Sequence, residues 1–386
     1  MYMDNKIKKI GIICEYNPFH NGHIYHIEKI KEMFPDSIII LVMSACFTER
    51  GEISILNKWD KTEIALNHNI DLVVELPHFY ATNSADIFAE GSIRILSYLN
   101  CDYLVFGSEC NNINLLEQLV DTQLYNDEYD NLVQDYMDNG LNYPTSMSKA
   151  LKDLCDETVT SPNDLLGLSY IKQIKLQESR IIPVSIQRTN NYHDKEIIDN
   201  IASATSIREA LKNNQDITDY VPLDTKEHII NTNYEEKYFT LLKYKLISEI
   251  NELDKYLDVS EGLDKRIKKF ILKSNNLNEL IDNIKTKRYT YNRLNRIFLH
   301  IMTNLKKEDT ILLKQINYIK VLGFNDKGKD HLKEIRKEAL IPIITNYSEL
   351  DDQVLDYELQ VTFLYNYITN QEELNQKELK SIPIMK

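Results

Sequence analysis

No apolar run in this 386-residue chain approaches the length that crosses a bilayer. The first six residues contain no hydrophobic signal core, and the first apolar stretch is only as long as a strand. Internal repeats and long low-complexity segments are also missing. The hydrophobic content of 43% and the charged content of 27% are ordinary for a globular chain. We therefore expect a cytoplasmic protein with no membrane partner and with enough residues for two domains.

Cysteine is scarce, and its spacing excludes the usual cysteine-based sites. No two cysteines form a C-x-x-C pair, and an odd number without a framework indicates reduced thiols and neither a disulfide scaffold nor a zinc site. His20, His23 and His26 stand three residues apart, a spacing that metal ligands also show, but no Cys or carboxylate cluster accompanies them. We expect no dedicated metal site and no tightly bound cofactor. The five cysteines are Cys14, Cys46, Cys101, Cys110 and Cys155.

Positive charge is in deficit, because 45 Lys and Arg residues against 59 Asp and Glu residues give a net charge of −14. This balance argues at first sight against a nucleic-acid partner, but the charge is unevenly placed. Between Lys265 and Arg296, ten basic residues accompany only two acidic ones, a local charge of +8. Such a run is commonly a solvated helical face, whereas interleaved tyrosines that stack on unpaired bases favour RNA. The candidate RNA contacts are Lys285, Lys287, Arg288, Tyr289, Arg293 and Arg296.

The pattern of apolar residues predicts an α/β fold. Strand-like runs without polar alternation are separated by helical stretches, which is typical of a parallel sheet covered on both faces. From about Tyr220 helical patterns dominate, with short strand-like pieces at Tyr318–Leu322 and Ile341–Ile344. We predict a parallel-sheet domain over residues 1–218 and a mainly α-helical domain over residues 219–386. The expected strands of the first domain are Lys9–Cys14, Ser37–Met43, Asp71–Glu75, Tyr103–Phe106 and Ile181–Ile186.

One turn near the N-terminus carries most of the functional information. A buried strand stops at Asn17-Pro18, and Gly22 lies where an amphipathic helix begins. The free N–H groups at a helix start attract phosphate oxygens. The imidazoles of His20 and His23 can donate to charge that grows on an α-phosphate and a leaving pyrophosphate. A purely structural turn is the alternative, but the strand before and the helix after favour a nucleotide. The segment His20–His23 thus resembles the H-x-G-H motif of the nucleotidyltransferase superfamily.

Other residues are candidates for the same crevice. Gly107 and Arg188 follow two further strands, and the carboxyl ends of parallel strands meet at one edge of a sheet. Asn163 begins a helix nearby in sequence. Ser206 and Arg208 lie at a helix start rich in hydroxyl groups, which can hold phosphate through backbone, hydroxyl and guanidinium donors. Ordinary helix capping accounts for the hydroxyl groups equally well.

Several segments together resemble the bacterial tRNA(Met) cytidine acetate ligase family. The resemblance runs from the N-terminus to about residue 305 and is most specific in the first 210 residues. It implies a Rossmann-like, parallel-sheet nucleotidyltransferase domain followed by a mainly α-helical domain that helps to hold tRNA. One departure is Ala45-Cys46 after Ser44, where the family usually has Gly-Asn. The matching segments are Glu15–His23, Arg50–Glu52, Asp71–Pro77, Ser84–Gly91, Phe106–Glu109, Ser161–Asn163, Tyr192–Asp194, Ser203–Arg208 and Thr286–Tyr291.

The resemblance implies an ATP-dependent ligase. Such enzymes join acetate to ATP as acetyl-adenylate, release pyrophosphate and pass the acetyl group to the wobble cytidine of elongator tRNA(Met), which becomes N4-acetylcytidine. The implied partners are ATP, acetate and this tRNA, with Mg²⁺ accompanying the ATP, and the oligomeric state stays open. Two other functions stay open from the residues alone. One is an adenylyltransferase acting on a small phosphorylated metabolite, and the other is a non-catalytic RNA-binding protein with ATP as a structural ligand.

The resemblance also assigns site residues. The family's later nucleotide contacts fall on Gly107, Asn163 and Arg188, and the predicted catalytic residues are His20 and His23. The family's ATP-binding stretch falls on Ile13, Cys14, Glu15, Tyr16, Asn17, Pro18, Phe19, His20, Asn21, Gly22, His23, Ile24, Tyr25 and His26.

Overall fold

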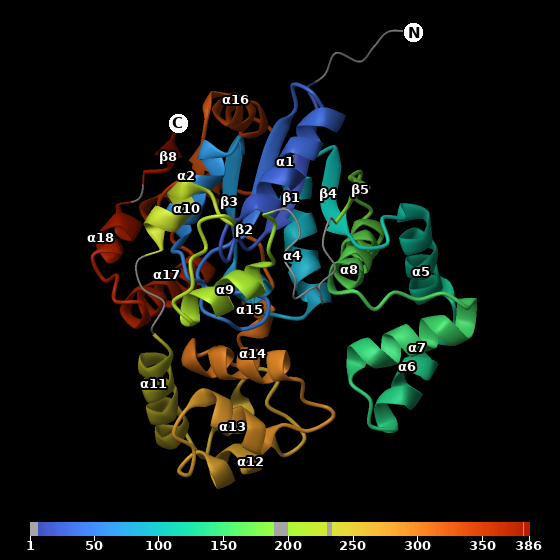
Figure 1. Cartoon of the computed structure of the whole chain (residues 1–386), viewed down its shortest axis with the longest axis vertical. Helices are drawn as coiled ribbons and strands as arrows, with labels where there is room; N and C mark the ends of the chain where they lie inside the picture. The colour runs from blue at the N-terminus through green and yellow to red at the C-terminus, as the bar shows by residue number, and fades with distance from the viewer. Residues whose placement is uncertain (1–6, 189–199, 230–233, 381) are drawn as a thin grey trace.

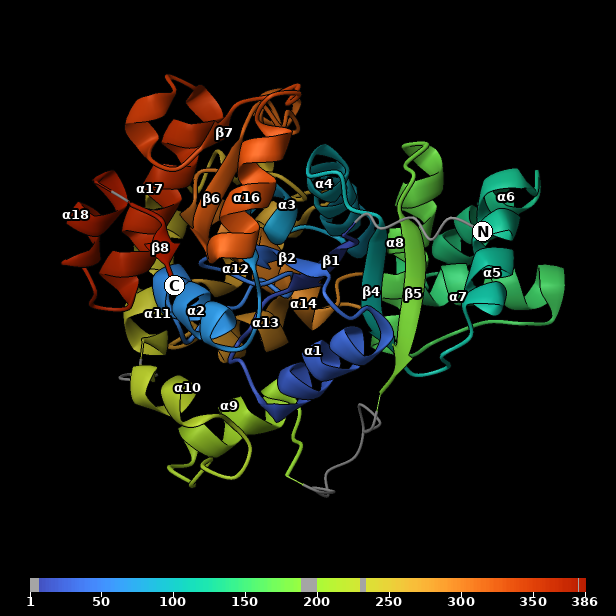
Figure 2. The same cartoon turned by 90° about the horizontal axis from the view of Figure 1, so that it is seen from above.

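The computed structural model describes residues 7–188, 200–229, 234–380 and 382–386. These residues form one mostly parallel sheet with helices on both faces, as Figures 1 and 2 show. The predicted α/β class is therefore confirmed. The strands are Lys9–Cys14 (β1), Ile38–Ser44 (β2), Leu72–Leu76 (β3), Tyr103–Ser108 (β4), Ile182–Gln187 (β5), Ile319–Phe324 (β6), Ile343–Ile344 (β7) and Ile384–Met385 (β8).

The strand order places the carboxyl ends of β1, β4 and β5 side by side. The order is β5-β4-β1-β2-β3-β6-β7, and β8 pairs with β6. The first five strands are parallel to one another, with Ile10 opposite Ile39 and Val105 opposite Val184, whereas β6 runs antiparallel to β3. All five strands expected in the first part of the chain form, each within two residues of its predicted ends.

Helices cover both faces of the sheet, and Figure 2 shows α1 and α4 on opposite sides of β1 and β2. In the part of the chain that the structure describes, no helix is both long and apolar enough to cross a bilayer. The helices are Asn21–Met33 (α1), Lys58–Asn67 (α2), His78–Ala81 (α3), Ala85–Tyr98 (α4), Ile113–Tyr125 (α5), Tyr129–Asp138 (α6), Tyr143–Cys155 (α7), Pro162–Leu176 (α8), Ala204–Lys212 (α9), Leu223–His228 (α10), Glu235–Ser248 (α11), Leu263–Phe270 (α12), Leu277–Ile284 (α13), Tyr291–Met302 (α14), Thr310–Leu313 (α15), Asp326–Ile335 (α16), Gln353–Ile368 (α17) and Leu374–Leu379 (α18).

Side chains of β2 show how the two cores form. Ile38, Ile40 and Val42 point into a core shared with α4, α5 and α8, while Ile39 and Leu41 point into a core shared with α1, α2 and α11–α14. Successive side chains of a strand alternate between the faces of a sheet, so both faces must be apolar when both are covered. This explains why β2 is an uninterrupted apolar run.

The C-terminal part of the chain has two portions. Helices α11–α14 form a separate layer at the lower end of the molecule in Figure 1, which we call the helical layer (residues 235–302). The chain then returns to the sheet, where β6 adds an antiparallel strand beside β3, packs against α16 and forms an ion pair with α18. The segment 219–386 is mainly helical, and its last strands complete the sheet of the first segment.

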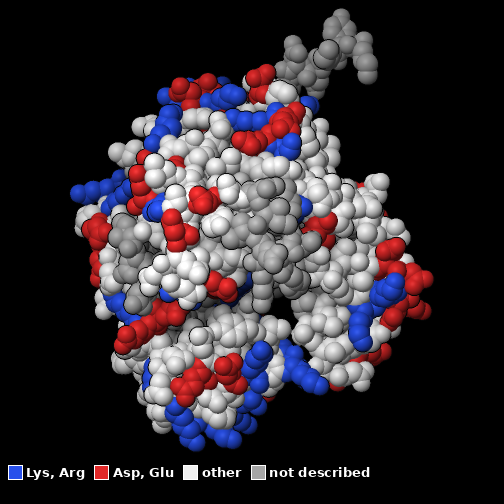
Figure 3. All heavy atoms as spheres, viewed as in Figure 1, with Lys and Arg blue, Asp and Glu red and all other residues white. Residues whose placement is uncertain are grey.

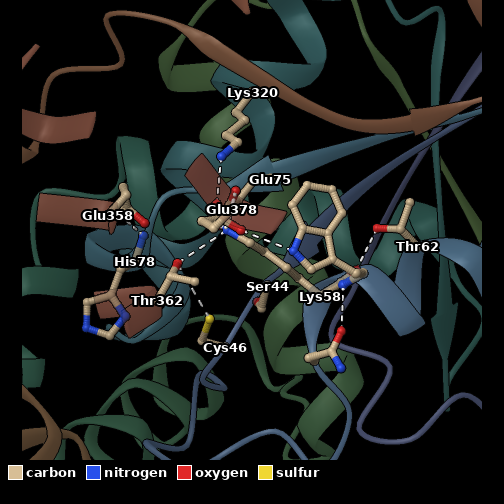
Figure 4. A network of polar contacts seen from close by, with 12 residues as sticks. Ser44, Cys46, Lys58, Thr62, Glu75, His78, Lys320, Glu358, Thr362 and Glu378 are labelled. Carbon is tan, nitrogen blue, oxygen red and sulfur yellow. Dashed lines mark hydrogen bonds and ion pairs between the residues drawn. The ribbon is translucent and has the colours of Figure 1, made fainter. Parts of the chain in front are cut away.

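A buried ionic network holds this returning portion in place (Figure 4). Lys58 at the start of α2 lies 3.0 Å from Glu75 of β3 and 2.7 Å from Glu378 of α18. Lys320 of β6 lies 2.7 Å from the same Glu378 oxygen. Trp59 Nε1 donates to the other Glu378 oxygen over 3.1 Å. Buried charges are tolerated only when they are paired and hydrogen-bonded, so these contacts are expected to be mutually dependent.

Two carboxyl groups of the network have pKa values shifted in opposite directions. Burial alone would raise the pKa of Glu378, but Lys58 and Lys320 hold it at about 2. Glu358 of α17 also lies there and accepts the His78 N–H over 2.7 Å, and burial raises its pKa to about 8. Near neutral pH the Glu378 carboxylate is therefore ionised between Lys58 and Lys320, while Glu358 keeps its proton.

Candidate active site

A cleft opens at the carboxyl ends of β1, β4 and β5. Its walls come from the turn after β1, the start of α1, the loop after β4, the start of α8 and the segment before α9. This is the edge at which parallel α/β sheets bind ligands. The lining residues are Ile13, Cys14, His20, Gly22, His23, Tyr25, His26, Phe106, Gly107, Asn163, Leu166, Tyr170, Ile186, Gln187, Arg188, Ile201, Ala202 and Ser203.

The two histidines of the turn form the N-terminal cap of α1. His20 Nδ1 accepts the Gly22 N–H over 3.1 Å, and His23 Nδ1 accepts the His20 N–H over 3.1 Å. A ring nitrogen that accepts a hydrogen bond carries no proton, so each neutral imidazole holds its proton on Nε2. The Nε2–H groups are therefore the donors that both rings offer to a ligand in the cleft.

Both imidazoles are neutral at physiological pH. Burial lowers the pKa of His20 to about 3, and the positive charges of Arg188 and Arg208 lower it as well. Burial also holds the pKa of His23 well below its usual range, with further contributions from His20, His26 and Arg188. Their rings lie with centroids 3.8 Å apart, and two charged rings at that distance would repel. The pair is thus a set of two neutral donors.

On the side of the cleft opposite α1, the Arg188 side chain lies over Gly107. Arg188 follows β5 and its stem lies over Gly107, where a Cβ would stand 3.2 Å from Arg188 Cγ. The carboxylate of Glu109 lies 3.7 Å from Arg188 Nε and accepts the Asn163 Nδ2–H over 2.6 Å. Asp164 in turn accepts the Ser108 hydroxyl and the Glu109 N–H. These contacts hold the loop after β4 against the start of α8.

The start of α9 closes one side of the cleft. Ser203 caps this helix by accepting the Ser206 N–H over 3.1 Å, and Ala202 and Ser203 line the cleft. The first N–H groups of a helix lack partners within it, which makes this position suited to an anion. Arg208 does not line the cleft, because its guanidinium donates to Glu52 and to the Asn17 carbonyl, each over 2.8 Å.

Part of the predicted ATP-binding stretch supports the turn and does not face the cleft. Tyr16 and Phe19 are buried and pack against His23 in T-shaped and stacked contacts. Asn17 accepts the Ile55 N–H over 2.9 Å, and Asn21 donates to two carbonyl groups. The residues predicted for ATP that lie outside the lining are Glu15, Tyr16, Asn17, Pro18, Phe19, Asn21, Ile24, Ser206 and Arg208.

The structure places the predicted RNA contacts differently, and Arg293 is half-buried with its guanidinium 4.6 Å from the centre of the Tyr289 ring. Lys285, Lys287 and Arg288 are exposed at the end of α13 and in the loop that follows. Tyr289 is only 3% exposed and its hydroxyl donates to the Ser260 carbonyl over 2.8 Å, so the prediction that it contacts RNA is corrected. Arg296 turns inward to Glu49 and is likewise no surface cation. Tyr289 lies in the loop before α14, where tertiary packing buries its ring, and Arg296 lies on the side of α14 that contacts Glu49.

Apolar lining residues are the main part of the site that motif reading missed. Phe106, Leu166, Tyr170 and Ile186 line the cleft from β4, α8 and β5. Their signal in the sequence is that of ordinary core residues, since nothing local separates a cleft wall from a core. The motif Tyr192–Asp194 lies outside the described residues.

Among the described residues, no carboxylate lines the cleft and no group of three or more His, Cys, Asp or Glu side chains is placed to hold a metal ion. Mg²⁺ prefers carboxylate and other oxygen ligands. The described lining therefore does not fit a protein-held Mg²⁺, and no step below depends on one. Each of the five cysteines is free.

The fold and the cleft define a nucleotidyltransferase of the HIGH class. The family model described as HIGH Nucleotidyl Transferase matches residues 7–381. Two solved structures of TmcAL from Thermotoga maritima have the same fold at 28% identity. The apo form has a TM-score of 0.89 and the form bound with alpha-thio ATP one of 0.88, and each comparison covers 98% of this chain and 99% of the other.

Curated relatives narrow the class further. A tRNA(Met) cytidine acetate ligase of Anoxybacillus flavithermus is 38% identical over 98% of this chain and 100% of its own length. One of Clostridium novyi is 38% identical over 97% of this chain and 98% of its own length. The chain belongs to the tRNA(Met) cytidine acetate ligase family, as the motifs in its sequence indicated.

Proposed function

We propose that this protein is an ATP-dependent tRNA(Met) cytidine acetate ligase. The observation that carries the proposal is the pair of neutral imidazoles, each fixed with its Nε2–H available at a cleft that also contains Arg188 and a helix start. Full-length relatives bearing this name and a similar structure bound with alpha-thio ATP support it.

The first step is the activation of acetate. The acetate carboxylate attacks the α-phosphate of ATP, and the bond from that phosphorus to the leaving pyrophosphate breaks. His20 and His23 donate Nε2–H bonds to oxygens that gain negative charge, while Arg188 and the start of α9 hold further phosphate oxygens. The protein supplies no nucleophile, because the acetate carboxylate serves as one.

The second step is the transfer of the acetyl group to RNA. The exocyclic amine of cytidine is a weak nucleophile because its lone pair is delocalised into the ring, so it requires an activated anhydride such as acetyl-adenylate. The amine attacks the acetyl carbonyl, AMP leaves and a proton is lost. A wobble base lies in a loop and can be unstacked to reach the cleft.

We assign tRNA binding to the helical layer. Exposed basic residues gather on α12, in the turn that follows it and in the loop between α13 and α14, along the lower edge of the molecule in Figure 3. A hollow separates this layer from the α6–α7 hairpin in the same view. Such cations contact phosphates without regard to sequence, so they position the RNA. The exposed basic residues of this surface are Lys265, Lys269, Lys273, Lys285, Lys287 and Arg288.

Incubation with radiolabelled acetate, ATP and total tRNA tests the proposed reaction. We expect label in tRNA, and nuclease digestion should return it as N4-acetylcytidine. Release of pyrophosphate that requires a phosphorylated metabolite and leaves RNA unlabelled would point to a metabolite adenylyltransferase. If the tRNA gains no label and no pyrophosphate is released, the protein is a non-catalytic RNA-binding protein.

Replacing Lys285, Lys287 and Arg288 together by alanine should weaken tRNA binding. Each phosphate contact contributes a slope of about −0.7 to −0.9 to the dependence of log affinity on log salt, so three lost contacts should reduce that slope by about two to three. Filter binding at several salt concentrations measures this. The matched control replaces Lys327, Lys329 and Lys333, which are exposed on α16 at the opposite end of the molecule in Figure 1. Equal losses in both triple variants would show that the effect is only one of net charge.

A further inference from the structure

The loop between β2 and α2 lies between the turn of the cleft and the helical layer. We call residues 46–53 of this connection the bridging loop. Internal hydrogen bonds give it a fixed shape, because the Thr48 N–H donates to the Glu52 carbonyl over 3.0 Å and the Gly51 N–H donates to the Thr48 carbonyl over 2.9 Å. Phe47 and Ile53 also pair as a short antiparallel bridge. These bonds close the loop on itself, so the residues that contact its two sides are joined through it.

The bridging loop holds the helical layer through Arg296 of α14. Arg296 Nη1 donates to Glu49 Oε1 over 2.8 Å and to the Glu49 carbonyl over 3.2 Å. Only 14% of the Arg296 side chain and 27% of the Glu49 side chain are exposed, so water screens this pair less than a surface pair. Gly51 has a φ of +73°, and a Cβ there would stand 2.5 Å from the Arg296 backbone nitrogen. Only glycine permits so close an approach.

The same loop holds the turn of the cleft through Glu15. The Glu49 N–H donates to Glu15 Oε1 over 2.6 Å, and Glu15 follows directly after the last residue of β1. Burial raises the pKa of Glu15 to about 7, and the bond from Glu49 opposes that rise. Glu49 is thus bonded to the helical layer through its side chain and to the start of the turn through its backbone.

A second contact joins the loop to the start of α9. Arg208 Nη2 donates to Glu52 Oε2 and Arg208 Nη1 donates to the Asn17 carbonyl, each over 2.8 Å. Asn17 lies in the turn between β1 and α1, and its side chain accepts the Ile55 N–H just beyond the loop. The bridging loop is therefore bonded to the turn through Glu49 and to α9 through Glu52, and Arg208 of α9 is bonded to the turn.

From these contacts we infer that Arg296 and Glu49 are positioning residues for the nucleotide-binding turn. The helical layer restrains the turn through the bridging loop, although neither residue lines the cleft. This inference rests on the nucleotide site proposed above. It also assigns Arg296 a role different from the tRNA contact that its sequence neighbourhood predicted.

The test is the affinity for ATP of the full chain without tRNA or acetate. Arg296→Met keeps most of the side-chain stem and removes the guanidinium, and calorimetric titration should show ATP binding weakened about tenfold. Arg296→Lys should lose less, because an ammonium still reaches Glu49 Oε1. The double variant R296M/E49A should bind no more weakly than R296M, since both substitutions break one connection.

Arg94→Met is the matched control. Arg94 of α4 donates to Glu90 over 2.8 Å at 32% and 25% side-chain exposure, but it has no place in the cleft or the bridging loop. Equal ATP affinity in R296M, R94M and the unsubstituted protein would overturn the inference and leave the nucleotide site standing. Failure of the unsubstituted protein to bind ATP would overturn the site itself and the inference with it. If R296M does not fold, E49A gives the same two outcomes from the other side of the contact.

Discussion

Acetate-dependent exchange of pyrophosphate into ATP should fall about 10²- to 10³-fold in His20→Ser, the loss expected when one donor to a charge-developing oxygen is removed. Serine is a good N-terminal cap, so it replaces the bond from Gly22 while leaving no donor that reaches the cleft. The combined change of His20 and His23 to alanine should abolish the exchange. Incorporation of labelled pyrophosphate into ATP measures both.

His68→Ser is the control for this prediction. His68 stacks on Phe19 with ring centroids 4.9 Å apart, as His23 does at 5.4 Å, but it does not line the cleft. We expect it to keep the exchange rate within about twofold. Unchanged exchange in the variants of His20 and His23 would remove the two imidazoles from the chemistry.

Glu378→Gln should cost about 3 to 5 kcal/mol of unfolding free energy, because it leaves Lys58 and Lys320 buried without their shared carboxylate. Urea unfolding followed by circular dichroism measures the loss. Glu63→Gln is the control, since its ion pair with Lys386 has the same type of contact at 2.8 Å but 38–39% exposure. Exposed pairs contribute about 0 to 1 kcal/mol. Equal losses in the two variants would contradict the importance of burial.

The lowered pKa of Glu378 predicts that the unfolding free energy of the protein depends on pH in the acid range. The pKa of Glu378 is about 2 in the folded protein against an ordinary 4.5, since Lys58 and Lys320 outweigh the opposing effect of burial. A carboxyl group with a lowered folded pKa stabilises the protein above its unfolded pKa, and this stabilisation is lost as the pH falls from about 4.5 to 2. The unfolding free energy of the unsubstituted protein should therefore fall more steeply over this range than that of Glu378→Gln. Parallel curves would contradict the assignment.

Local sequence patterns were sufficient to predict most of the individual strands and helices. Uninterrupted apolar runs identified β1 to β5, because strands covered on both faces must be apolar on both. The helix after His20 was equally clear from its spacing of isoleucines. The α6–α7 hairpin was not anticipated, although its apolar side chains pack into the core shared with α4, α5 and α8. The edge of the sheet that receives β6 was also undetermined, because strand pairing is a contact between segments far apart in sequence.

Some residues of the candidate site could also be predicted from the sequence, and others could not. His20, His23 and Gly22 were recognisable because strand, turn and helix start lie within a few residues. Tyr289 and Arg296 were wrongly predicted as RNA contacts, since Tyr289 is buried in the loop before α14 and Arg296 turns its guanidinium toward Glu49. Apolar cleft walls such as Tyr170 had no local signal at all.

What the sequence determined by itself was the chemistry of the turn and the class of fold, because both depend on residues adjacent in the chain. The tertiary structure decided which imidazole nitrogen carries the proton, which cations remain on the surface, and how the last strands join Glu378 to Lys58. These features arise from burial and from hydrogen bonds between distant segments. Their geometry exists only once the chain has folded.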